Sequence, residues 1–193
     1  MVMKKKKSLP VNNVSLIKRF FAYLLDYYFG LLLCSLPIVL ANGIVNQSDV
    51  MQTNLYLFAD QPKVLYLVAI FSLILGYFYY VHIPLHVWRG QTVAKRMLHF
   101  KIVKDNGDPV DFKALFLRYI LGMMLIEGSL ICCTSIFTQL LSYSFSIDFM
   151  KPWNTVGMII TILSIVWMLF NPQHKMFHDY IAKTIVTNTE DKN

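Results

Sequence analysis

Four long apolar segments dominate the pattern of hydrophobic and polar positions along the chain. We place them near residues 20–41, 64–88, 114–141 and 155–170. Each is long enough to cross about 30 Å of hydrocarbon as a helix. The polar residues gather between these segments and near the two termini. The pattern therefore predicts an all-α integral membrane protein with four transmembrane helices.

This pattern predicts three parts. Residues 1–18 form a basic cytoplasmic tail, residues 19–187 form one transmembrane domain, and residues 188–193 form a C-terminal tail. Hydrophobic residues make up 56% of the 193 positions, above the roughly 45–50% of ordinary soluble domains. The composition excludes an ordinary soluble domain and a disordered chain.

The basic residues predict the orientation. Six lie in the tail up to Arg19, six in the loop 89–113 and three near the C-terminus, whereas the other two loops have one each. Cytoplasmic loops are enriched in Lys and Arg. With four crossings the basic segments all fall on one side, so both termini are expected in the cytoplasm. The net charge of +7 then reflects orientation and contact with anionic lipid headgroups, and no nucleic-acid partner is expected.

Asp26 is the first candidate for function, because it lies inside the first apolar segment. Helical spacing places it on one face with Arg19, and Ala22 lies between them. An ionised carboxylate in lipid costs roughly 2.5–3.5 kcal/mol on insertion scales. The cost falls where the group faces other helices, water or a cation.

The third apolar segment also contains charged residues. A continuous helix would place Glu127 near the middle of the membrane and on the same face as Thr134 and Thr138, with Arg118 on the opposite side. A polar stripe at that depth lines a wet path or seals against another polar helix. Glu127 is the second candidate carboxylate.

A small β patch is predicted on the cytoplasmic face. Residues 101–103 resemble a short strand, and the Asn106-Gly107 pair after them suits a tight turn. Residues 184–187 are strand formers near the end of the chain. We expect these two segments to pair.

No metal, cofactor or enzymatic site is predicted. The three cysteines fall inside predicted membrane segments and are interpreted as small apolar packing residues: Cys34, Cys132 and Cys133. Two pairs of histidines are spaced four apart, but no glutamate joins them in a metalloprotease-like arrangement. Capping and interfacial hydrogen bonds explain these histidines better.

Four short motifs occur in a fixed order, at residues 19–26, 90–103, 105–118 and 171–186. In these motifs the chain resembles the RDD family of bacterial and archaeal membrane proteins, named for an arginine and two aspartates. The resemblance covers roughly residues 14 to 187. The matching residues include Arg19, Ala22, Asp26, Gly90, Thr92, Lys95, Gly107, Arg118, His178, Asp179 and Thr184.

The resemblance implies a multi-pass protein of the bacterial cell membrane. It also implies transport, since sodium–proton exchange is described for some members. The chain departs from the family pattern in two ways. Ala94 stands where the family usually has glycine, which weakens the idea of an anion-binding turn there. The family is often described with three spans, whereas four are predicted here.

Two interpretations of the charged residues stay open. In the first, Asp26 and Glu127 bind and release H⁺ or Na⁺, while Arg19, Arg118 and Lys95 tune their proton affinity. In the second, Arg19, Asp26, Arg118 and Asp179 form a fixed cluster that only holds helices together. A different class of function is an accessory or assembly subunit, as a homo-oligomer or with a membrane partner protein.

Overall fold

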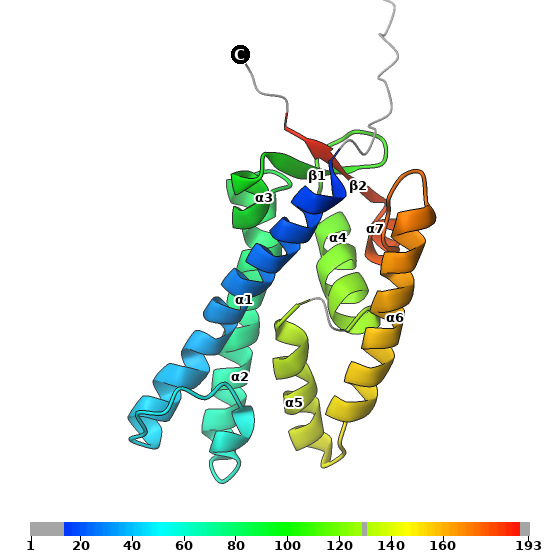
Figure 1. Ribbon diagram of the computed structural model, residues 1–193. Coiled ribbons are helices and arrows are strands. Elements are labelled where there is room, and N and C mark those ends of the chain that lie inside the picture. The colour runs from blue at the N-terminus through cyan, green and yellow to red at the C-terminus, as the bar shows by residue number, and fades with distance from the viewer. Residues whose placement is uncertain (1–13, 129–130, 190–193) are drawn as a thin grey trace, which may run out of the picture.

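The computed structural model describes residues 14–128 and 131–189. Most of the predicted basic tail and of the predicted C-terminal tail lies outside these residues. Three long helices extend away from a small polar layer at one end of the molecule (Figure 1). They are α1 (Leu16–Val45), α2 (Pro62–Tyr77) with its π-helical continuation η2 (Phe78–Val87), and α6 (Met150–Phe170).

These three helices are long and apolar enough to cross a membrane. They correspond to the first, second and fourth predicted segments. Pro37 in α1 and Pro84 in η2 lie within the helices. A proline has no backbone N–H and so cannot donate the usual helical hydrogen bond. At the end of η2 the turn is π-helical, and Trp88 N–H donates to Ile83 O, five residues earlier, at 3.0 Å.

The prediction of one continuous third helix at residues 114–141 was wrong. The structure has α4 (Phe112–Leu115) running into the π-helix η3 (Phe116–Ile126), and then a separate helix α5 (Cys133–Phe145). The chain breaks at Gly128, whose φ of +65° is accessible mainly to glycine. The supposed stripe of Glu127, Thr134 and Thr138 therefore does not exist, because these residues do not share one helix.

Helix α6 packs closely against this break. A Cβ atom on Gly157 would lie 2.9 Å from Glu127 O, and one on Gly128 would lie 3.0 Å from Gly157 Cα. Thr161 donates its hydroxyl hydrogen to Glu127 O at 2.8 Å. The main-chain groups freed by the break are thus partly satisfied by a neighbouring helix, as buried main-chain groups require.

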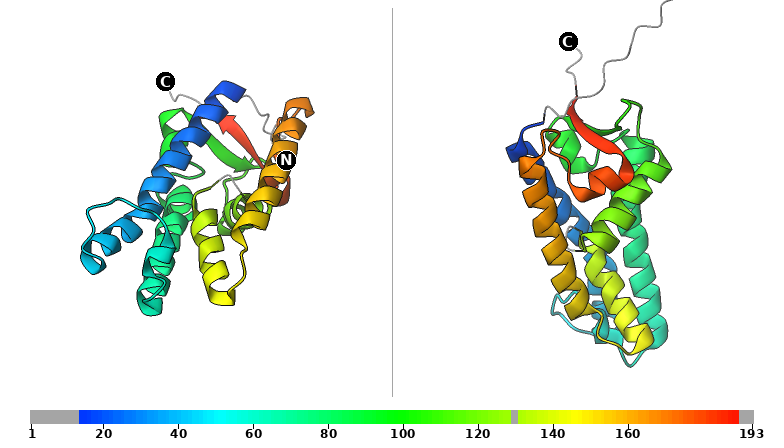
Figure 2. Two further views of the ribbon diagram at one scale, coloured as in Figure 1. Left: turned by 60° about the horizontal axis from the view of Figure 1, so that its bottom comes forward. Right: turned by 90° about the vertical axis from the view of Figure 1, so that its right-hand side faces the viewer.

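The polar layer consists of two short helices and a two-stranded sheet, gathered at one end of the helices in every view (Figure 2). Helix α3 (Val93–Met97) precedes β1 (Phe100–Lys104), and α7 (Phe177–Ala182) precedes β2 (Thr184–Asn188). The strands are antiparallel, with Lys101 opposite Thr187 and Lys104 opposite Thr184. The predicted pairing of these two segments is confirmed. A further short helix, η1 (Leu55–Phe58), lies between α1 and α2.

We expect Gly157→Ala to lower the melting temperature of the detergent-solubilised protein by several degrees. The added methyl group has no space beside Glu127 O, and overpacking typically costs about 1–3 kcal/mol. Differential scanning fluorimetry measures the shift. The matched control is Gly43→Ala in α1, where no atom lies within 4 Å of the new Cβ. Equal melting temperatures for the two variants would contradict the close packing.

Candidate functional site

Asp26 is buried where α1, η2 and α3 meet. Its Oδ1 accepts a hydrogen bond from Tyr79 Oη at 2.7 Å, and its Oδ2 accepts one from Thr92 Oγ1 at 2.9 Å. Lys95 Nζ forms an ion pair with Oδ2. Thr92 is the N-cap of α3, which places Lys95 on the first turn of that helix and directs it at Asp26. The loop motif of residues 90–98 therefore supplies the partners of the carboxylate in α1.

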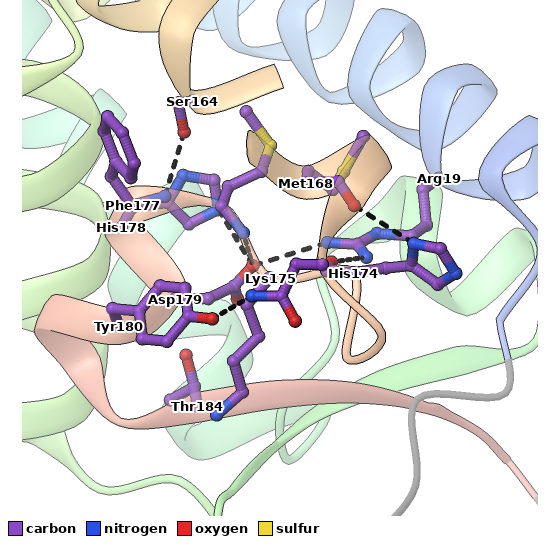
Figure 3. Close-up of polar contacts among 12 residues, drawn as sticks. Arg19, Ser164, Met168, His174, Lys175, Phe177, His178, Asp179, Tyr180 and Thr184 are labelled. Atoms are coloured by element: carbon purple, nitrogen blue, oxygen red, sulfur yellow. Dashed lines mark hydrogen bonds and ion pairs between the residues drawn. The ribbon is translucent and has the colours of Figure 1, made fainter. Parts of the chain in front are cut away.

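Asp179 is the centre of a second cluster, and Figure 3 shows it together with Arg19, His178 and Thr184. It lies in the first turn of α7 and accepts hydrogen bonds from Met176 N–H at 3.0 Å and Arg19 Nη2 at 3.3 Å. Arg118 Nη1 forms an ion pair with its Oδ1 and also donates to Thr184 Oγ1 at 2.8 Å. One carboxylate thus joins α1, η3 and α7.

The ion pairs outweigh burial in both clusters. Burial alone would raise the pKa of the Asp179 carboxyl, but Arg118, His178 and Arg19 hold that pKa well below its usual range. Burial alone would lower the pKa of the Lys95 ammonium, but the charge of Asp26 raises it above its usual value. Asp179 is therefore ionised and Lys95 protonated at neutral pH.

Glu127 is fully buried at the break after η3. Its Oε1 accepts hydrogen bonds from Ser164 Oγ at 2.7 Å and from His178 N–H at 3.2 Å. Its Oε2 lies 2.7 Å from His178 Nδ1. The side chain connects η3 to α6 and α7.

His178 links the two acidic residues Glu127 and Asp179. Its Nδ1 faces Glu127, and its Nε2 lies 3.7 Å from Asp179 Oδ2. An imidazole between two carboxylates can accept a proton on one nitrogen and release one from the other. Glu127, His178 and Asp179 form a polar row that continues to Arg19 and Arg118 in the layer at the end of the helices.

A cavity of about 220 Å³ lies between these clusters. Asp26, Lys95, Arg118 and His178 line it, together with apolar residues of α1 and α6. Arg118 Nε and Tyr119 Oη belong to lining residues, are buried, and have no hydrogen-bond partner within the described part of the chain. Buried polar groups in proteins normally have partners, so these two atoms could bind a polar molecule in an otherwise largely apolar cavity.

Several of the sequence-predicted residues meet at the cavity but have different partners. Arg19, Ala22 and Asp26 line the same cavity, as their helical spacing implies, but Arg19 and Asp26 bind different partners. The proposed fixed cluster of Arg19, Asp26, Arg118 and Asp179 is thus divided, because Asp26 pairs with Lys95.

The two glycines of the motifs have backbone roles. Gly90 has a φ of +79°, and its carbonyl accepts from Ile102 N–H at 2.8 Å. Gly107 has a φ of +82° in the turn after β1.

Tyr79 and Ser164 contact the carboxylates directly but were not among the predicted site residues. Tyr79 stands beside other tyrosines in the second apolar segment, yet it is only 1% exposed. Ser164 lies on the buried face of α6 with Gly157 and Thr161. The only available signal was a polar group on an otherwise apolar face, and such a signal does not identify its partner.

We expect Asp179→Asn to destabilise the protein by about 3–5 kcal/mol, because it leaves Arg118 buried without its counter-charge. Urea or thermal unfolding in mild detergent measures the loss. The control is Asp49→Asn, at an exposed aspartate. A loss no larger than that of the control would show that the Arg19–Asp179–Arg118 cluster contributes little stability.

The lowered pKa of Asp179 also predicts acid sensitivity. A carboxylate with a depressed folded-state pKa stabilises the protein fully above its unfolded value, about 3.9, and this stabilisation is lost as the pH falls through the folded-state value. We expect the melting temperature to fall below about pH 4, and to fall less steeply in Asp179→Asn. Parallel slopes in the two proteins would contradict this role.

No curated protein and no solved structure is significantly similar to the chain. The model of the RDD family, however, matches residues 14–183. This match includes both charged clusters, the loop that supplies Lys95 and the three apolar helices. The chain belongs to the RDD family and is a membrane protein with apolar helices.

Proposed function

We propose that this RDD protein exchanges protons for a monovalent cation such as Na⁺ across the bacterial cell membrane, with Asp26 as the exchanging carboxylate. The observation that carries the proposal is the Asp26–Lys95 ion pair at the wall of the cavity. A buried carboxylate with a cationic partner has two alternative ligands, a proton and a metal cation, either of which neutralises it when the partner withdraws.

The surroundings of Asp26 suit such an exchange. Tyr79 and Thr92 donate hydrogen bonds to its two oxygens, so the carboxylate keeps its position when Lys95 moves. Lys95 lies on a short helix in a loop rather than on a long apolar helix. A change in its position therefore involves a residue of the loop and not one of α1, α2 or α6.

Glu127 and His178 supply a second proton-binding element. A proton on Glu127 can pass to His178 over the 2.7 Å contact, and His178 lies 3.7 Å from Asp179 near the end of the helices. Since His178 also lines the cavity, this row connects the break in the third crossing to the space beside Asp26.

The proposal includes four crossings with both termini in the cytoplasm. Helices α4 and η3 followed by α5 would make up the third crossing as two short pieces. A reporter fused to each terminus tests the orientation: we expect activity typical of the cytoplasm at both ends. Opposite locations of the two ends would mean an odd number of crossings.

Sodium-dependent proton movement in proteoliposomes tests the transport proposal. We expect addition of NaCl to dissipate an imposed pH gradient in vesicles that contain the intact protein, and Asp26→Asn to reduce this rate at least tenfold. Glu127→Gln should also slow it, whereas Asp49→Asn should not. A folded intact protein that leaves the gradient unchanged would overturn the proposal.

The alternative, an accessory or assembly subunit, is favoured by a different observation. Only three of the 21 residues in α6 are buried, and each interior carboxylate already has a cationic or histidine partner. Most of α6 is thus available to a second copy or to another membrane protein. Cross-linking in native membranes tests whether the protein is a monomer or is bound to a partner. A monomer that transports cations would contradict the subunit proposal.

A further inference from the structure

Three thiols converge at a point away from the charged clusters. Cys34 lies in α1, Cys132 is the N-cap of α5 and Cys133 is the first residue of α5. All three are buried, and their Sγ atoms lie within 4.8 Å of one another. The closest pair, Cys34 and Cys133, is 3.2 Å apart. They are the only cysteines in the sequence.

A glycine of α2 provides the space for these sulfur atoms. A Cβ atom on Gly76 would lie 2.2 Å from Cys133 Sγ and 3.1 Å from Cys34 Sγ. No side chain other than hydrogen fits at this position while the sulfurs stay in place. The thiols therefore occupy a cradle formed by α1, α2 and the start of α5.

From this geometry we propose that Cys34, Cys132 and Cys133 bind a soft monovalent metal ion, Cu(I), through sulfur alone. Thiolate ligands select soft ions. A metal ion about 2.3 Å from each of three sulfurs holds them about 4.0 Å apart. The closest pair, Cys34 and Cys133 at 3.2 Å, reaches that spacing by separating less than about 1 Å.

The number of ligands selects Cu(I) over Zn²⁺. Structural zinc sites are almost always four-coordinate, and within the described residues no histidine or carboxylate completes this group. Cu(I) is stable with two or three thiolate ligands. Binding displaces protons from the thiols, so the affinity rises with pH.

The site is independent of the proposed cation exchange. Cys34 lies eight positions after Asp26 in α1, about 12 Å along the helix at about 1.5 Å per residue. None of the three cysteines lines the cavity beside Asp26. Failure of one proposal therefore leaves the other intact.

Anaerobic competition for Cu(I) tests the site. The full chain is purified in detergent, reduced, and titrated into the coloured Cu(I)–bicinchoninate complex. We expect one Cu(I) to be withdrawn per chain, and X-ray absorption of the product to show only sulfur neighbours. A protein that withdraws no Cu(I), or one whose copper has nitrogen or oxygen neighbours alone, would overturn the proposal.

Variants locate the binding. Cys34→Ser should weaken Cu(I) binding at least 100-fold, whereas the adjacent Ser35→Ala should leave it unchanged. Gly76→Ala keeps all three thiols but fills the cradle, and should also weaken binding, with Gly43→Ala as its control. Equal affinity in Cys34→Ser and the intact protein would overturn the three-sulfur site, whether or not Gly76→Ala folds.

Discussion

The contact between Asp179 and the two arginines Arg19 and Arg118 is the interaction on which the polar end of the molecule depends. Removing three charges from water is costly, and mutual attraction offsets the cost only when the geometry is good and the remaining polar atoms are bonded. Met176 N–H and Thr184 Oγ1 provide two of those additional bonds. Because the three charged residues come from α1, η3 and α7, satisfying this one carboxylate fixes the ends of the long helices relative to the sheet.

The break at Gly128 is the second constraint. It separates η3 from α5 in the interior of the protein, where buried main-chain groups need partners from neighbouring elements. Two residues of α6 provide partners at the break. Thr161 donates a hydrogen bond to the main-chain carbonyl of Glu127, and Ser164 donates one to its carboxylate. The face of α6 that carries Thr161 and Ser164 therefore satisfies polar groups at the break. Glu127 is bonded to residues of both α6 and α7.

The sequence predicted the helices and strands that are determined by residues close together in the chain. Three apolar helices follow from hydrophobic runs, and the strands at 100–104 and 184–188 follow from β-forming residues beside turn signals. It did not predict what depends on distant partners. The run of apolar residues at 114–141 hides the break, since Gly128 is informative only once Gly157 lies against it. Likewise, the spacing of Cys34 and Cys132 in the sequence gives no sign that their sulfur atoms meet.

The pairing of β1 with β2 and of Arg19 with Asp179 has a consequence for biogenesis. Arg19 and Asp179 are 160 positions apart, so the arginine enters the membrane region long before its carboxylate has been synthesised. Asp26 meets Lys95 much earlier, after 69 positions. The Asp26–Lys95 pair can therefore form before the last segment has been synthesised, because all of its elements precede residue 100. The polar end can close only after α7 has been synthesised, and a chain truncated before Asp179 lacks the counter-charge of Arg19 and Arg118.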